Sequence, residues 1–130
     1  MSAENQSPQH PKEAFAWAVK TGDLKSVKEF VEKDKFDVNM VEEGVSKRTP
    51  LHWAADFGKV DVIKYLISKG AKVNAKDNYG ITPLLAAVYE SHTDAVKALL
   101  EAKADTSVKG PDDKTAKEAA ESESVRNLFK

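Results

Sequence analysis

The sequence contains no cysteine, no long apolar run and no clear excess of charge of either sign. Without cysteine, a disulfide scaffold, thiol catalysis and a thiolate zinc site are excluded. Twenty Lys and Arg stand against 21 Asp and Glu, which leaves no basic face for nucleic acid. No segment approaches the roughly 18 consecutive apolar residues of a membrane span. We therefore expect neither nucleic acid nor a membrane among the partners.

The length allows one domain or one short repeat array. Residues 1–12 are polar, carry no apolar stretch of the kind a signal peptide has, and are predicted to be a disordered tail. Residues 13–130 are predicted to form the folded domain. Charged residues make up 32% of the chain, and so much solvated surface is typical of an elongated stack.

The chain repeats itself every 33 residues. Thr49-Pro50-Leu51 recurs as Thr82-Pro83-Leu84, and Thr115-Ala116 follows at the same spacing. A less regular copy surrounds Trp17 and Gly22. A fixed period of this length indicates a repeat architecture. The predicted units cover roughly residues 13–45, 46–78, 79–111 and 112–130.

Each unit is predicted to contain two helices and a turn. Thr49 is the expected N-cap of a first helix, and Pro50 its first residue, where the missing N–H of proline would be unpaired anyway. Gly58 and Gly70 are expected to end the first and second helices in the left-handed conformation. One such helix pair cannot bury both of its faces, so stacking must supply the core. The predicted fold class is an all-α solenoid of stacked helix-turn-helix units.

The run Thr49-Pro50-Leu51-His52-Trp53-Ala54-Ala55 resembles an ankyrin repeat, and the 33-residue period supports the resemblance. Gly58, Gly70 and Val73-Asn74 also stand where that repeat has them. The resemblance covers residues 13–130 and implies an ankyrin-repeat solenoid of about four units. Its terminal units are atypical and polar, as the end caps of a solenoid must be.

Three stretches are similar to a group of small all-ankyrin proteins that bind the heterodimeric actin capping protein. They are residues 14–24, 81–92 and 104–112, the last of which contains Val108-Lys109-Gly110-Pro111-Asp112, a run that is not part of the repeat consensus. The resemblance implies that this chain keeps capping protein off filament barbed ends. It also implies a monomer in the cytoplasm, with presence in the nucleus left open. The alternative is an adaptor or regulator of another partner, such as a transcription factor or a kinase, since ankyrin arrays bind many unrelated proteins.

The sequence departs from the repeat pattern at a few positions. The connection from Met40 to Arg48 is two residues longer than in the family that it resembles. Ser91, Lys103 and Asp113 stand where glycine is usual. These departures concern turns and leave the predicted fold unchanged.

No set of residues predicts chemistry. The three histidines are scattered, and no paired carboxylates have metal-ligand spacing. His52 and His92 are interpreted as structural residues, with the His52 ring bonding backbone in the turns. Nothing resembles a nucleophile elbow or a phosphate-binding loop. We therefore expect no enzymatic activity, no metal and no cofactor.

Aromatic and acidic residues on the first helices and at the turn tips are the candidate contacts, because these segments line the concave side of such an array. Interfaces favour Trp and Tyr as anchors. For Trp17 and Trp53, packing between repeats and contact with a partner have equal weight. Asp56 and Glu90 are interpreted as equivalent positions in an acidic rim for a basic partner, although charges of this kind are more often merely solvated. The candidate partner-binding residues are Trp17, Glu42, Glu43, Trp53, Asp56, Phe57, Tyr79, Tyr89 and Glu90.

Overall fold

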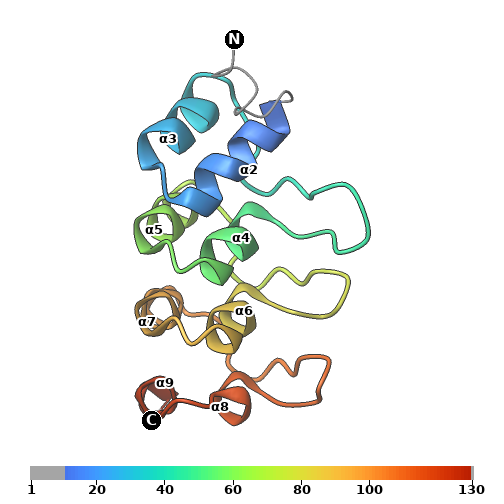
Figure 1. The fold of residues 1–130 in the computed structure, drawn as a ribbon, viewed down its shortest axis with the longest axis vertical. Helices are drawn as coiled ribbons and strands as arrows, with labels where there is room; N and C mark the ends of the chain where they lie inside the picture. Colours follow the sequence, from blue (N-terminus) through green and yellow to red (C-terminus); the bar gives the residue numbers. More distant parts are fainter. Residues whose placement is uncertain (1–10, 130) are drawn as a thin grey trace, which may run out of the picture.

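The computed structural model describes residues 11–129, and the helices in this range stack as four successive pairs (Figure 1). The first helices of the pairs form one column and the second helices form another, while long loops project from the first column on the side away from the second (Figure 1). The first helices are α2 (Pro11–Thr21), α4 (Pro50–Asp56), α6 (Pro83–Tyr89) and α8 (Ala116–Ala119). The second helices are α3 (Leu24–Glu32), α5 (Val60–Ser68), α7 (Thr93–Glu101) and α9 (Glu123–Arg126), the last followed by the 3-10 turn η1 (Asn127–Phe129).

The N-terminal boundary of the domain differs from the prediction by two residues. The sequence assigns Pro11 and Lys12 to the tail, but both lie in α2. Proline at the first position of a helix loses no hydrogen bond and has a φ suited to the helix, which explains the earlier start. The remainder of the predicted tail, residues 1–10, lies outside the described residues.

The predicted helix starts are confirmed. Thr49 caps α4, where its hydroxyl accepts a hydrogen bond from the backbone N–H of His52. Thr82 and Thr115 cap α6 and α8 in the same way. The predicted stops are confirmed as well, since Gly58 and Gly70 follow α4 and α5 with φ angles of 68° and 95°.

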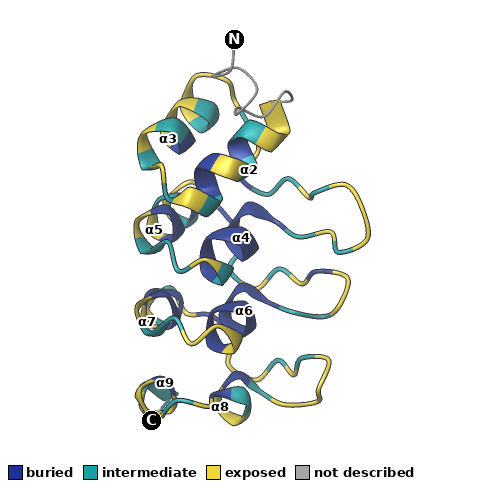
Figure 2. Cartoon of the chain, viewed as in Figure 1, coloured by how far each residue is buried: buried dark blue, intermediate teal, exposed yellow. Residues whose placement is uncertain are grey.

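The core lies between the two columns of helices and between successive pairs. Figure 2 shows α4 and α6 buried almost throughout, while the loops and the outer sides of the second helices are largely exposed. At the N-terminal end, the fully buried ring of Phe15 packs against Phe30 and Phe36, with ring centroids 5.6 and 5.3 Å away. Each fully buried large apolar side chain of this kind contributes about 1.5–3 kcal/mol to folding. The largest fully buried apolar side chains are Phe15, Leu51, Ile63, Leu66, Leu84, Leu85 and Leu99.

Polar side chains join each unit to the next. Asn39 accepts a hydrogen bond from Lys72 N–H (2.8 Å) and donates one to the Gly70 carbonyl (3.0 Å). Asn74 repeats the first of these bonds one unit later, where it accepts from Asp105 N–H at 2.8 Å. These bonds fix the register between units, because each needs a partner about one repeat away.

Three of the loops form short hairpins, which we call fingers: finger 1 is residues 40–48, finger 2 is 75–81 and finger 3 is 108–114. The hairpins are closed by backbone bonds from Glu42 to Arg48 (2.9 Å), from Asp77 to Ile81 (3.0 Å) and from Gly110 to Lys114 (3.0 Å). Five residues lie inside the first closure and three inside each of the others. Finger 1 is therefore two residues longer than the other two fingers of this chain.

Lys103 has a φ of 68° in the turn after α7, as its place at a usual glycine position predicts. A lysine in this conformation is strained, whereas glycine adopts it freely. We expect Lys103→Gly to be neutral or to stabilise the protein by up to about 1 kcal/mol. Thermal melting measures the effect. The control is Lys97→Gly in the exposed middle of α7, which should cost about 1 kcal/mol, and a clear loss of stability in Lys103→Gly would contradict the assignment.

His52 is buried, and its ring joins two units. Its Nδ1 accepts from Thr49 N–H at 3.1 Å, so Nε2 carries the proton and donates to the Ile81 carbonyl at 2.7 Å. Burial lowers the pKa of His52 below its ordinary value of 6.5, against the opposing effect of the Ile81 carbonyl, and the nearby Arg48 lowers it further. This environment confirms the structural role predicted for His52. His92 has a similar role, since its Nε2 lies 2.9 Å from the Asp56 carbonyl.

The lowered pKa of His52 predicts a loss of stability in mild acid. As the pH falls below 6.5, the unfolded chain takes up a proton at this ring before the folded chain does, so unfolding becomes more favourable. We expect the free energy of unfolding, measured with urea at pH 7.5 and 5.5, to decrease toward the lower pH. His52→Gln should be less stable at both values but should lose less between them. An equal decrease in both proteins would assign the acid sensitivity to other groups.

Candidate protein-binding surface

The exposed large apolar side chains of residues 11–129 all belong to first helices, to the residues that cap them, or to fingers. None belongs to a second helix of the described chain. The set comprises Trp17, Val41, Val45, Phe57, Tyr79 and Tyr89. Exposed apolar groups that gather on one side of a monomer indicate a surface for a partner.

Trp17 and Trp53 occupy equivalent places in successive units but have opposite environments. Trp17 is 60% exposed, whereas Trp53 is 4% exposed. The first unit covers Trp53: Lys20 Nζ lies 5.4 Å from the ring centroid, and the indole N–H donates to Glu42 at 3.2 Å. The Trp53 ring therefore packs between units, and of the two residues only Trp17 has its ring on the surface.

Glu42 and Glu43 are neighbours in finger 1 with different surroundings. Glu42 is half-buried and accepts hydrogen bonds from Ser46 and Trp53. Burial raises the pKa of Glu42, but the hydrogen bonds, first of all that from Ser46, outweigh it and keep the pKa below the ordinary value. Glu43 has an 88% exposed side chain, 3.7 Å from Lys12. A partner can therefore reach Glu43 directly, while Glu42 already serves to cover Trp53.

Asp56 belongs to an internal ion-pair network that sequence reasoning did not find. Its carboxylate lies 3.7 Å from Arg48 Nη1, and Arg48 Nε lies 3.7 Å from the carboxylate of Asp77. Arg48 closes the hairpin of finger 1, Asp56 ends α4 and Asp77 opens the hairpin of finger 2, so the network joins three segments. The charge of Asp56 is therefore largely compensated within the protein.

The structure corrects the expected equivalence of Asp56 and Glu90. Asp56 is the last residue of α4 and matches Tyr89, the last residue of α6. The matching C-cap residues are Phe57 and Glu90, so the acidic and aromatic side chains exchange places between the two units. Phe57 and Glu90 are both exposed. The error arose because both units carry an aromatic residue next to an acid, in opposite order.

Tyr89 reaches from the end of α6 to finger 3. Its side chain is 37% exposed, and its hydroxyl lies so close to Gly110 that a Cβ at that position would overlap it. Burial and the Asp112 carboxylate raise the pKa of Tyr89. Gly110 and Asp112 belong to the run that sets this chain apart from the repeat consensus, and the contact gives that run a physical role. Tyr89 thus both supports finger 3 and faces solvent.

Val41 and Val45 of finger 1 are also exposed, and sequence reasoning did not identify them. Val45 is 75% exposed and Val41 is 50% exposed. Aromatic and acidic residues mark candidate contacts in a sequence, whereas valine in a turn gives no comparable signal. Only the hairpin geometry shows that these side chains are turned outward.

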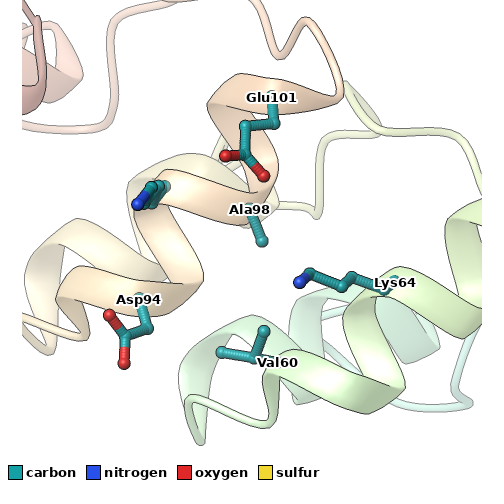
Figure 3. A pocket seen from close by; sticks show the side chains of 6 residues that line it. Val60, Lys64, Asp94, Ala98 and Glu101 are labelled. Carbon is teal, nitrogen blue, oxygen red and sulfur yellow. The ribbon is translucent and has the colours of Figure 1, made fainter.

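The described part of the chain offers little for chemistry. No group of three or more His, Asp or Glu residues within residues 11–129 could hold a metal ion. A cavity of about 320 Å³ lies between α5 and α7, on the column away from the fingers. Figure 3 shows Lys64 reaching into it from α5, with Asp94 and Glu101 on α7, and only Val60 and Ala98 supply apolar lining. Binding sites for small molecules are usually mostly apolar, so this groove does not resemble one.

Among the helices of residues 11–129, none combines the length and the apolar character that crossing a bilayer needs.

Comparisons with known proteins agree on the architecture. A family model described as "Ankyrin repeats (3 copies)" matches residues 11–110. Myotrophin of Xenopus tropicalis is 48% identical over 115 residues, which are 88% of this chain and 95% of that protein. The 26S proteasome non-ATPase regulatory subunit 10 of Dictyostelium discoideum is 41% identical over 67% of this chain, which spans only 37% of that subunit. Among solved structures, the ankyrin repeat domain of Bcl-3, a unique member of the IkappaB protein family, aligns with a TM-score of 0.80 and 28% identity, over 89% of this chain and 50% of the other.

Proposed function

The chain belongs to the ankyrin-repeat family, and we propose that it is a non-enzymatic, monomeric module that sequesters the heterodimeric actin capping protein. Sequestration keeps capping protein off barbed ends and so promotes filament growth. The observation that carries the proposal is the 48% identity to myotrophin over nearly the whole of both chains. It extends the resemblance of this sequence to small all-ankyrin proteins that bind capping protein. The proposed compartment is the cytoplasm, with presence in the nucleus left open.

We propose that only some of the candidate residues contact the partner directly. Trp17, Phe57, Tyr79 and Tyr89 are exposed aromatic anchors on first helices, their caps and finger 2. Glu43 and Glu90 are exposed acids, the first in finger 1 and the second at the C-cap of α6. Acidic groups of this kind would chiefly accelerate association with a basic partner surface, and salt would weaken the effect. We propose that Trp53, Asp56 and Glu42 hold the neighbouring surface residues in place and do not contact the partner themselves.

The direct test is actin elongation from barbed ends in the presence of purified capping protein, titrated with this protein. We expect elongation to be restored at near-stoichiometric amounts. If capping is unchanged and no direct binding is found, the proposed function is wrong and the resemblance describes the fold alone.

Charge reversal at Glu90 tests the acidic part of the surface. We expect Glu90→Lys to lower the affinity for capping protein by about tenfold at low salt and by less at high salt. Glu29→Lys makes the same change on α3, in the other column, and should bind like the unmodified protein. Titration calorimetry at two salt concentrations measures both. Equal affinities for the two variants would remove Glu90 from the interface.

The alternative function is that of an ankyrin adaptor or regulator for another partner, such as a transcription factor or a kinase. The similarity to a proteasome regulatory subunit supports this alternative, because that relative belongs to a different assembly and shares 41% identity with this chain over two thirds of its length. Identifying the proteins that this chain captures from cytosolic extract distinguishes the two functions. Recovery of the capping-protein heterodimer as the sole tight partner supports sequestration, and its absence beside another tight partner supports the adaptor.

A further inference from the structure

The three tyrosines of the chain differ in what their hydroxyl groups contact. Tyr65 lies in α5 and donates a hydrogen bond to the Glu32 carboxylate at 2.7 Å. Burial and this bond raise the pKa of Tyr65 to about 12. Tyr89 ends α6, and its hydroxyl is packed against Gly110 of finger 3. Both hydroxyls are therefore already engaged by other segments of the protein.

Tyr79 has the opposite surroundings. It lies inside the finger 2 hairpin that the bond from Asp77 to Ile81 closes, and it is 52% exposed. Its backbone N–H is bonded to the Asp77 carboxylate, whereas its hydroxyl makes no hydrogen bond to any residue of the range 11–129. The ring also lies outside the set of side chains that form the core or pack against it. A chemical change at this hydroxyl therefore leaves the core intact.

The backbone around Tyr79 is fixed, although its ring is free. Asp77 accepts the N–H groups of Tyr79 and Ile81 at 2.8 and 2.9 Å, and Asn78 donates its N–H to finger 1 at 2.8 Å. The fingers project from the first column of helices (Figure 1). A tyrosine holds its hydroxyl at the far end of its ring, so this hydroxyl can enter the active site of an enzyme while the hairpin stays folded. An ordered backbone also keeps the entropy lost in such an encounter small.

The charges near Tyr79 suit an added phosphate. Lys76 stands three residues before it in finger 2, and Lys47 follows the finger 1 residue whose carbonyl accepts the bond from finger 2, and both lysines are exposed. Asp77, two residues before Tyr79, has a carboxylate that is 1% exposed and lies 3.7 Å from Arg48. A phosphate on tyrosine carries a charge of about −1.5 to −2 at neutral pH. The exposed lysines offer that charge a favourable environment, and the buried acid is already compensated.

We propose that Tyr79 is a phosphorylation site for a protein tyrosine kinase, and that its phosphorylation weakens the binding of capping protein. The kinase transfers the γ-phosphoryl group of Mg²⁺-bound ATP to Tyr79 Oη. The bond from this phosphorus to the oxygen of the leaving ADP breaks, a bond from Oη to phosphorus forms, and the hydroxyl proton passes to the catalytic base of the kinase.

The effect on binding rests on the proposed function, whereas the site rests on the surroundings of Tyr79 alone. An aromatic anchor is desolvated when a partner binds. A dianion at the same place would have to lose its hydration, which disrupts an interface. Attraction to a basic partner surface is screened by physiological salt within about 8 Å and does not offset this loss.

Mass spectrometry tests the site. The full chain is incubated with Mg²⁺, ATP and a purified tyrosine kinase that phosphorylates a random copolymer of glutamate and tyrosine. We expect the phosphate at Tyr79, and at least tenfold less uptake in Tyr79→Phe. The matched control, Tyr65→Phe with Tyr89→Phe, keeps Tyr79 as its one tyrosine and should take up as much phosphate as the unmodified chain. Preferential modification of Tyr65 or Tyr89 in the folded chain, or no uptake at all, would overturn the assignment.

Titration calorimetry with the purified heterodimer tests the effect on binding. Phosphorylation at Tyr79 should lower the affinity about tenfold or more without changing the melting temperature, and a tyrosine phosphatase should restore the affinity. Full affinity of the phosphorylated chain, or a lowered melting temperature, overturns the regulatory role. If the unmodified protein does not bind the heterodimer, the proposed function fails and the regulatory role fails with it, while the mapped phosphate still decides the site.

Discussion

Replacing Trp53 by alanine is expected to lower the free energy of unfolding by about 3–5 kcal/mol, the usual cost of removing a buried tryptophan. Replacing Trp17 by alanine should leave that free energy nearly unchanged. It should instead lower the affinity for capping protein by about 2 kcal/mol, roughly 30-fold, as the loss of an interface anchor does. The two residues hold equivalent positions in their units, yet one substitution should reduce stability and the other should reduce binding.

The physical reason is the difference in burial. The Trp53 ring is 4% exposed beneath Lys20 and Glu42, so its removal leaves a cavity and takes one hydrogen bond from the Glu42 carboxylate. The Trp17 ring is 60% exposed, and its removal leaves no cavity. Urea unfolding measures the first effect and calorimetric titration the second. Loss of stability in Trp17→Ala, or full affinity in that variant, would show that the ring belongs to the core or faces away from the partner.

Replacing Asp77 by alanine is expected to destabilise the protein by about 3 kcal/mol. Its carboxylate is 1% exposed and accepts two backbone hydrogen bonds, from Tyr79 N–H at 2.8 Å and from Ile81 N–H at 2.9 Å. Bonds to a buried charged acceptor are worth about 1.5–3 kcal/mol each, and removal of the acceptor leaves the donors unpaired. Arg48 Nε, which is buried without a hydrogen-bond partner, would also lose the charge 3.7 Å away.

Asp77→Asn separates the two contributions. Asparagine keeps an oxygen for the two backbone donors but carries no charge for Arg48, so this variant should lose less stability than alanine does. Chemical unfolding at neutral pH compares the two with the unmodified protein. If alanine and asparagine cost the same, the ion pair with Arg48 dominates and the turn bonds contribute little.

The sequence was sufficient for the fold because the same local signals recur in each unit. Thr49 and Thr82 start helices, and Gly58 and Gly70 end them, through hydrogen bonds and φ angles that depend on a few adjacent residues. The left-handed turn residue Lys103 could be identified by its register alone. Such features need no knowledge of distant contacts.

The surface was harder to predict because it depends on neighbours from other units. Trp17 and Trp53 have the same local pattern, and only the presence of Lys20 and Glu42 above the second makes it part of the core. The pairing of Asp56 with Arg48 likewise crosses from α4 to the end of finger 1. No periodicity in the sequence reports these contacts. The local sequence pattern therefore predicts the helices and turns, while the stacking of the units determines which side chains remain exposed to a partner.

The last unit is built from shorter helices than the units before it. Helices α8 and α9 have four residues each, whereas α5 and α7 have nine. Helices of one turn are not stable alone, and a terminal unit packs against only one neighbour. Amide protons of Glu123–Arg126 should accordingly exchange with deuterium well before those of Val60–Ser68.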